Sequence, residues 1–258
     1  MAKSIAPTAH FRKVLGFTLI EMAIVLMIVG FLLSGLLVSL TQSADNTRRT
    51  NATAQLQRIE EALYGFAQTT GRLPCPASSA TNGLEAGPDG TGQCAVPTTS
   101  HHGFVPAATL GLIGPVNSDG LLLDPWGNPY RYSVSNKMHG ASRAFTLASN
   151  LNTFFNSLSP LPADYATNML RVCTDSTCSD IITDLAPAVV LSMGPNWATF
   201  TSANEVANAG NVVVGGYRLT NTNQFVSTTY NEDNFDDLIV WLSPNVLFSR
   251  MISAGRLP

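Results

Sequence analysis

The sequence predicts an α+β protein, in which one long N-terminal helix packs against an antiparallel β-sheet from the C-terminal part of the chain. Residues 17–40 form an apolar run that continues without proline into a polar stretch ending near Gly71, as a single long helix would. After Asp124, short apolar segments are separated by Gly, Pro, Asn and Ser, which is typical of strands joined by turns. A helix followed by several strands favours the α+β class.

The first half of the predicted helix is long and apolar enough for a membrane. It contains no Lys or Arg and one acid, Glu21, and at about 1.5 Å per residue it would cross a hydrocarbon core of roughly 30 Å. A short basic leader, residues 1–16, precedes it, and such basic residues stay on the cytoplasmic side. We therefore expect a membrane helix at residues 17–42 and a head outside the cytoplasm at residues 43–258.

A specific motif lies where the leader meets the apolar run, and it reads Gly16-Phe17-Thr18-Leu19-Ile20-Glu21. It resembles the processing and assembly signal of type IV pilins and of the pseudopilins of type II secretion. In that family a prepilin peptidase cuts after the glycine and methylates the new N-terminal phenylalanine. The resemblance implies a pilin-like fold, an inner-membrane precursor with a periplasmic head, and a place in a filament or on the cell surface after assembly.

Glu21 is energetically unfavourable inside a membrane, because placing a carboxylate there without a partner costs at least about 2.5–3.5 kcal/mol. Cleavage would give Phe17 a free amine, and the resemblance implies that Glu21 of one subunit neutralises this amine on the next. A plain signal anchor with a protonated Glu21 is one alternative. A secretory signal peptide is another, but its apolar core should run roughly 7–15 residues, shorter than this one.

Charge and motifs exclude several functions. Only 12% of the residues are charged and the net charge is −3, which becomes −6 when the leader's Lys3, Arg12 and Lys13 are removed. This balance argues against general nucleic-acid binding. The sequence has no G-x-S-x-G elbow, no P-loop and no H-E-x-x-H, so we expect no enzyme.

The four cysteines predict two disulfides, because their number is even and the head leaves the cytoplasm. Of the possible connectivities we expect nearest neighbours to pair, Cys75 with Cys94 and Cys173 with Cys178. A zinc site is the competing reading, but the sequence lacks paired C-x-x-C spacing.

The second half of the long helix is amphipathic. Apolar residues recur at three- and four-residue steps and predict a stripe that packs on the sheet, namely Leu56, Ile59, Leu63 and Phe66. Residues 73–124 follow as a long loop rich in Pro and Gly. Within it, residues 71–76 and 104–112 resemble segments of larger pilin-like proteins. His101 and His102 are expected to be exposed to solvent and not to bind a metal.

The motif Asp124-Pro125-Trp126-Gly127-Asn128-Pro129-Tyr130 predicts a turn capped by the Asp124 side chain. It resembles the turn of the major pseudopilin that leads into the first strand of its sheet, which implies that Trp126 packs the junction of helix, loop and sheet. The first strand would then begin at Tyr130. Further strands are expected at residues 144–148, 188–193, 212–220 and 237–242, and a short helix from Pro244 to near Gly255.

An acidic run at residues 231–237 carries four acids and two amides in seven positions. Hard oxygen ligands suit Ca²⁺, and Asp233, Asp236 and Asp237 are the candidate carboxylate ligands. The major pseudopilins bind calcium close to their C-terminal end, and this run is similar in composition and rough position. A solvated acidic turn is the alternative.

Together these features predict a structural subunit, a minor pilin or pseudopilin of a type IV pilus or type II secretion filament. Its partners would be the prepilin peptidase, the inner membrane and other pilin or pseudopilin subunits. The head is larger than that of a minimal pilin, which favours a minor subunit. A filament-tip adhesin or cargo-binding module on a pilin anchor is the alternative.

Overall fold

The computed structural model describes residues 16–96, 101–158, 165–200, 202–214, 216–231 and 234–258, and it describes no side chains for residues 33–42 and 214. The chain divides into two units, Met1–Thr47 and Arg48–Pro258, which are taken separately below. We call the second the head unit. Its mixture of one long helix and antiparallel strands confirms the predicted α+β class.

The long N-terminal helix is present as α1 (Leu19–Thr70), 52 residues without a break. Its end follows from the sequence. Gly71 has a φ of 78°, a conformation that glycine adopts at no steric cost, and its N–H donates to the Ala67 carbonyl at 2.9 Å.

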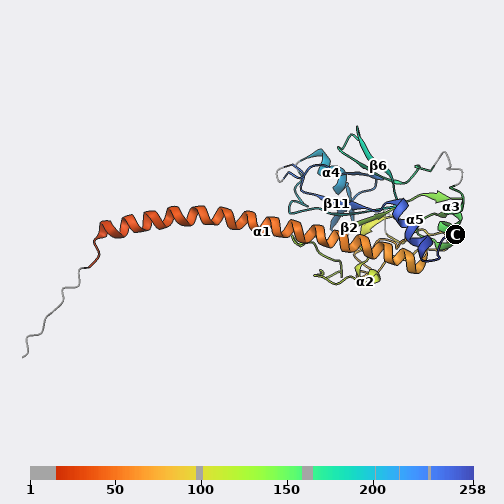
Figure 1. Cartoon of the computed structure of the whole chain (residues 1–258), viewed down its shortest axis with the longest axis horizontal. Coiled ribbons are helices and arrows are strands. Elements are labelled where there is room, and N and C mark those ends of the chain that lie inside the picture. Colours follow the sequence, from red (N-terminus) through yellow and green to blue (C-terminus); the bar gives the residue numbers. More distant parts are fainter. Residues whose placement is uncertain (1–15, 97–100, 159–164, 201, 215, 232–233) are drawn as a thin grey trace, which may run out of the picture. The chain divides into compact units, whose positions relative to one another are not determined.

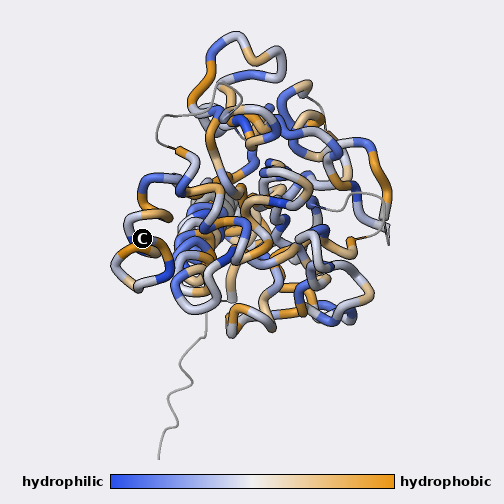
Figure 2. Tube along the Cα trace, turned by 90° about the vertical axis from the view of Figure 1, so that its right-hand side faces the viewer, coloured by the Kyte–Doolittle hydropathy of each residue, from blue (hydrophilic) through white to orange (hydrophobic). Residues whose placement is uncertain are grey.

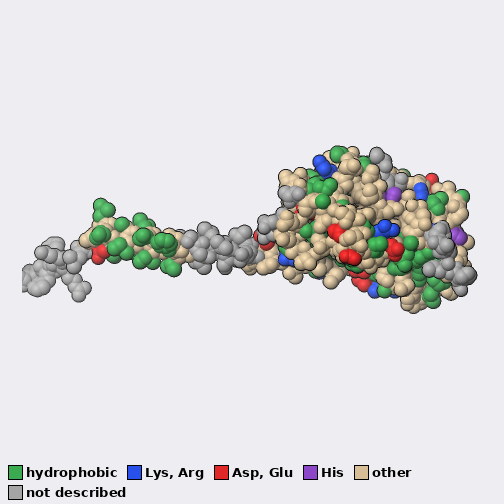
Figure 3. Space-filling model, turned by 90° about the horizontal axis from the view of Figure 1, so that it is seen from above, with side chains coloured by type: hydrophobic (Ala, Val, Ile, Leu, Met, Phe, Trp, Pro, Cys, Tyr) green, Lys and Arg blue, Asp and Glu red, His purple; other side chains and the backbone are tan. Residues whose placement is uncertain are grey.

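The membrane-spanning part of the prediction is not supported. Among the residues with described side chains, no helix is long and apolar enough to cross a membrane. Residues 33–42, which complete the predicted segment 17–42, lie outside that set. The described start of α1 is nevertheless apolar and exposed, and Figure 3 shows hydrophobic side chains gathered along it.

The centre of the head unit is a four-stranded antiparallel sheet in the order β1-β2-β7-β11. Figure 1 shows the part of α1 that belongs to the head unit running along it. Three of its strands lie where the sequence predicts strands, and β1 falls in the predicted loop. The bounds are β1 (His102–Phe104), β2 (Arg131–Val134), β7 (Ala188–Ser192) and β11 (Leu238–Trp241).

Strand β7 supplies side chains to two apolar cores, because successive side chains of a strand point to opposite faces. Ala188 and Val190 join the core that contains the α1 stripe. Val189 and Leu191 join a second core with residues of another sheet. The central sheet is thus covered on both faces, which explains why β7 is a continuous apolar run. In Figure 2 the last turns of α1 are seen end-on, surrounded by other segments of the head unit.

The second sheet has three strands in the order β10-β5-β6. Strand β10 pairs with β5 in parallel and β6 pairs with β5 antiparallel, so the head unit is not wholly antiparallel. The bounds are β5 (Leu170–Cys173), β6 (Ile181–Ala186) and β10 (Gln224–Val226), and helix α4 (Ala203–Ala209) lies beside β10. The remaining elements are α2 (Ala107–Leu110), β3 (Met138–His139), β4 (Ser142–Arg143), α3 (Ala148–Asn156), β8 (Val212–Val214), β9 (Tyr217–Leu219) and α5 (Pro244–Ser253).

One strand prediction was wrong, and a second was correct only in part. Residues 144–148 form a turn that leads into α3, because their polar groups bond to the loop instead of a strand: Phe145 accepts from the Leu73 N–H at 2.8 Å, and Thr146 Oγ1 donates to the Gly92 carbonyl. Residues 212–220 form the two strands of a hairpin, β8 and β9. The turn between them includes Gly216, whose φ is 86°.

The cysteines pair as Cys75–Cys94 and Cys173–Cys178, which agrees with the predicted nearest-neighbour connectivity. The first disulfide closes 19 positions of the long loop that follows α1, and the second closes 5 positions between β5 and β6. Both half-cystines of the first bridge are buried in the core that holds α1.

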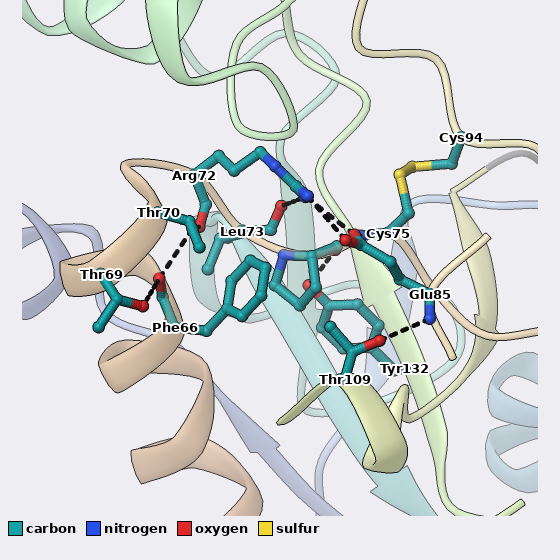
Figure 4. A network of polar contacts seen from close by, with 11 residues as sticks. Phe66, Thr69, Thr70, Arg72, Leu73, Cys75, Glu85, Cys94, Thr109 and Tyr132 are labelled. Carbon is teal, nitrogen blue, oxygen red and sulfur yellow. Dashed lines mark hydrogen bonds and ion pairs between the residues drawn. A yellow bond between two sulfur atoms is a disulfide. The ribbon is translucent and has the colours of Figure 1, made fainter. Parts of the chain in front are cut away.

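Glu85 joins the exit of α1 to the long loop (Figure 4). Its two carboxylate oxygens accept from the Arg72 guanidinium at 2.8 and 2.7 Å, and one of them also accepts from the Cys75 N–H at 2.9 Å. Its own N–H donates to Thr109 Oγ1 at 2.8 Å. Arg72 lies in residues 71–76 and Thr109 in residues 104–112, so Glu85 connects these two segments.

Candidate functional site

Gly16 and Phe17 lie just before Thr18, the residue that precedes α1, and both are exposed. The Phe17 side chain is 82% exposed, and a Cβ added at Gly16 would meet no atom within 4 Å. The peptide bond between Gly16 and Phe17 is therefore not covered by any residue that the structure describes. The leader before it, residues 1–15, lies outside the described residues.

Thr18 and Glu21 form a reciprocal cap at the start of α1. Glu21 Oε2 accepts from the Thr18 N–H and from Thr18 Oγ1, each at 2.9 Å, and the Glu21 N–H donates to Thr18 Oγ1 at 3.3 Å. This is a capping box, which satisfies N–H groups that have no partner inside the helix. Sequence analysis missed Thr18, although the T-x-x-E spacing signals such a cap. Within the described residues, Glu21 Oε1 accepts no hydrogen bond.

The last two acids of the acidic run are buried, whereas its amides Asn231 and Asn234 are exposed. Asp236 is 1% exposed and Asp237 is 4% exposed, while Asp233 lies outside the described residues. Two more buried acids come from distant elements, Asp124 before β2 and Glu205 on α4. Four carboxyl groups are thus buried in one region of the head unit, where their charges influence one another.

These acids differ in how well they are hydrogen-bonded. Asp237 Oδ2 accepts from Asn208 Nδ2 at 2.8 Å, and Glu205 Oε1 accepts from Asn196 Nδ2 at 2.8 Å and from the Asp236 N–H at 3.3 Å. By contrast, neither carboxylate oxygen of Asp236 accepts a hydrogen bond of standard geometry from the described residues, although the Asn196 N–H favours its charged form. Asn196 Oδ1 and Asp237 Oδ1 have no such partner either, so burial in this region is only partly compensated.

Burial controls how this region ionises. Burial, with a smaller contribution from the charge of Glu205, raises the pKa of Asp236 to about 7. Burial raises the pKa of Asp237 well above its ordinary range, although Asn208 and Arg131 oppose the shift. Among the described residues, no three His, Cys, Asp or Glu side chains are placed to hold a metal ion together.

The two histidines are not exposed, which corrects the prediction. His102 is 1% exposed and its Nδ1 lies 2.8 Å from Ser133 Oγ, while His101 Nε2 lies 3.1 Å from Asn223 Oδ1. The reason is that β1 pairs with β2 and places His102 opposite Ser133. Burial lowers the pKa of both imidazoles, so they are held neutral.

The Asp124 turn forms as predicted, but Trp126 does not hold it. Asp124 Oδ1 accepts from the N–H groups of Trp126 and Asn128 at 3.0 and 2.9 Å, and its Oδ2 accepts from Ser192 Oγ at 2.6 Å. Asn128 Nδ2 donates to the Gly194 carbonyl at 2.7 Å. Trp126 is only partly buried and lies outside the three apolar cores of the described chain. Buried polar bonds to the end of β7 therefore fix this turn.

Comparison with known proteins adds one finding. Residues 11–37 match the family model of the prokaryotic N-terminal methylation motif. No curated protein and no solved structure matched the chain. The matched range contains Gly16, Phe17 and the Thr18–Glu21 cap. The N-terminal part of this chain is therefore the signal of type IV pilins and pseudopilins.

Proposed function

We propose that the chain is the precursor of a minor pilin or pseudopilin, a structural subunit of a type IV pilus or type II secretion filament. The observation that carries this proposal is the methylation motif at residues 11–37, joined directly to the 52-residue helix α1. A long helix with an exposed apolar start suits side-by-side association with other such helices, because exposed apolar surface of this extent marks an interaction site.

The N-terminal part would have two kinds of protein partner. A prepilin peptidase would cleave between Gly16 and Phe17, which are exposed, and other pilin or pseudopilin subunits would contact the apolar surface of residues 17–32. Before assembly, the segment 17–42 would hold the subunit in the inner membrane, with residues 43–258 in the periplasm.

Glu21 would set the register of assembly. Its Oε2 is occupied by Thr18, whereas its Oε1 accepts no bond within the described residues, so one oxygen remains for a donor from outside the chain. The methylated amine of Phe17 on a neighbouring subunit is such a donor. A charge-assisted bond between them would offset the cost of placing a carboxylate in an apolar surrounding.

Processing is the direct test. The full-length protein is co-expressed with an active or an inactivated prepilin peptidase, and the N-terminal peptide is identified by mass spectrometry. We expect a mature chain that begins with methylated Phe17 only with the active peptidase. Gly16→Val should remain uncleaved yet folded, because a Cβ at this position meets no other atom. A mature protein that begins at Ala44 would contradict the proposal.

We also propose that the acidic region of the head unit binds a calcium ion through Asp236. The support comes from Asp236 itself and from a neighbouring amide. The Asp236 residue is 1% exposed, and its carboxylate accepts no hydrogen bond of standard geometry among the described residues. The Asn196 Oδ1 oxygen has no such partner either. Oxygen donors of this kind suit Ca²⁺. Asp237 and Asp233 are the other carboxylates of the proposal.

A further inference from the structure

Two neighbouring pockets lie beside the three-stranded sheet of the head unit, each with a volume of about 340 Å³. The first lies between the end of α4 and the start of β10, and the second lies against β5 and β6. Thr222 and Gln224 line both, so the pockets share a wall. Their volumes fall at the lower end of the roughly 300–1,000 Å³ of small-molecule sites.

The first pocket is lined by uncharged side chains. Asn211 and Asn221 are exposed, and neither side chain has a hydrogen-bond partner in the described part of the chain. Gln224 Nε2 donates to the Ser176 carbonyl at 2.9 Å, which leaves the Gln224 Oε1 as an acceptor. Val206, 48% exposed, adds an apolar surface. The pocket therefore offers amide donors and acceptors beside a small apolar wall.

This lining excludes several classes of ligand. Neither Lys nor Arg lines the first pocket to bind a phosphate, and neither Asp nor Glu lines it to bind a cation. A purely apolar ligand would strip water from the Asn211 and Asn221 amides without replacing their hydrogen bonds, which is costly. What fits is an uncharged ligand whose hydroxyl groups both donate and accept and whose C–H face is apolar, as in a sugar ring.

The second pocket extends this chemistry. Arg171 on β5 and Asp184 on β6 line it, so its charged side chains are of both signs. Within the described chain neither forms an ion pair, and both head groups are available to hydroxyl groups, to which charged partners bond more strongly than neutral ones. We propose that the two pockets together bind a neutral oligosaccharide, one sugar unit in each.

A single site of this kind should bind weakly, because it is open and its amides must be ordered on binding. Helix α4 and strand β6 lie at the top of the head unit in Figure 1, and Figure 3 views the molecule from that side. Most of the surface seen there is uncharged. In a filament, any two copies within reach of the same oligosaccharide would bind it together and raise the overall affinity. This last consequence rests on the proposed function, but sugar binding by the single chain does not.

To test this, the full-length protein is prepared in a detergent without sugar head groups and titrated with four sugars: lactose, maltose, cellobiose and diacetylchitobiose. Binding is measured by ligand-observed NMR. We expect at least one to bind with a Kd on the order of 1 mM. The double variant Asn211→Ala, Asn221→Ala should bind about tenfold more weakly, since two hydrogen bonds are lost. Its melting temperature should not change, because neither amide has a partner within the described chain.

Two further variants complete the test. Asn245→Ala removes an exposed amide from α5, remote in sequence from the pockets, and should bind like the wild type. Ala207→Trp places a large side chain in the first pocket and should abolish binding. A folded wild type that binds none of the four sugars overturns the proposal, as does binding that is unchanged in both pocket variants. N-acetylneuraminic acid, a charged sugar, is titrated as a fifth ligand, and binding to it alone would also overturn the proposal. Processing at Gly16 is measured on the same preparation, so this failure is distinguishable from failure of the pilin proposal.

Discussion

Glu21 is assigned two roles, and a single substitution that removes both would not show which of them matters for assembly. It caps α1 by accepting from Thr18, and it carries the charge that the proposed assembly contact needs. Glutamine at the same position of a capping box still accepts from the backbone N–H, whereas alanine does not. Glu21→Gln therefore removes the charge and keeps a cap, and Glu21→Ala removes both.

We expect both Glu21 variants to be cleaved normally and to enter sheared filaments at about a tenth of the wild-type amount or less, because each lacks the charge partner of the Phe17 amine. Quantitative immunoblotting of filaments and membranes measures this. If Glu21→Gln assembled like the wild type while Glu21→Ala failed, the cap and not the charge would determine assembly.

Two Arg–Glu pairs of similar geometry differ in exposure. In the Arg72–Glu85 pair the side chains are 18% and 17% exposed, and in the Arg250–Glu61 pair they are 36% and 62% exposed. Glu85 also accepts from the Cys75 N–H, so a substitution that removes the charge of Glu85 would deprive this N–H of its charged partner. The two glutamates therefore form a matched pair for substitution.

Glu85→Gln should lower the free energy of unfolding by about 2 kcal/mol, because a largely buried charge-assisted network is broken. Glu61→Gln should lower it by about 0–1 kcal/mol, since exposed pairs are screened by water. Urea unfolding followed by tryptophan fluorescence measures both, because all three Trp residues lie in the head unit. Equal losses would show that exposure does not decide the contribution of these pairs.

At the scale of elements, the two disulfides constrain loops of different length. Chain-entropy arithmetic gives about 3 kcal/mol for the Cys75–Cys94 loop and about 2 kcal/mol for the Cys173–Cys178 loop. We expect the double variant Cys75→Ser, Cys94→Ser to lose more stability than Cys173→Ser, Cys178→Ser, measured by urea unfolding. Peptide mapping without reductant should find both bridges in the wild type. Four free thiols in protein isolated from the periplasm would contradict this prediction.

Elements defined by local pattern were predictable from the sequence, and elements defined by distant contacts were not. Helix α1 and strands β7 and β11 follow from apolar periodicity and from glycine or proline at their ends. Phe145 instead bonds to Leu73 in the loop after α1, far along the chain, and such a contact leaves no local signal. His102 became buried for the same reason, since its partner Ser133 is 31 residues away.

At the scale of the whole molecule, the same distinction separates the two candidate sites. The N-terminal signal is contiguous, so Gly16, Phe17 and Glu21 were found from the sequence, and Thr18 followed the local T-x-x-E rule. The acidic region is assembled from the segment before β11, helix α4 and the turn before β2. The burial of Asp236 beside Glu205 therefore required the tertiary structure.

This burial links the stability of the head unit to pH. The pKa of Asp236 is about 7 against an ordinary value of 3.8, so between these values the folded state holds a proton that the unfolded chain has released. Asp236 should therefore make stability fall as pH rises from about 4 to 7. His101 and His102 act in the opposite direction, because their lowered pKa values make stability fall as pH drops below about 6.5.

Asp236→Asn isolates the contribution of this carboxyl group, because it keeps the side-chain shape and removes the titration. In chelator, the wild type should lose more stability between pH 5 and pH 8 than this variant does, with the histidine contribution common to both. Asp180→Asn, which changes an exposed acid between β5 and β6, should behave like the wild type. Melting temperatures at the two pH values measure the difference, and parallel curves for wild type and Asp236→Asn would refute it.

The buried charge of Asp236 can be neutralised by a proton or by a bound calcium ion, and adding calcium distinguishes the two. At pH 8 the proton is lost, and an ion bound only by the folded state would stabilise it by mass action. Calcium at about a hundred times its Kd should add about 2.7 kcal/mol to the wild type and nothing to Asp236→Asn. At pH 5 the gain should shrink, because the proton competes with the ion for the same carboxylate. Identical wild-type melting curves in calcium and in chelator at pH 8 would exclude the calcium site and leave protonation as the means by which Asp236 is accommodated.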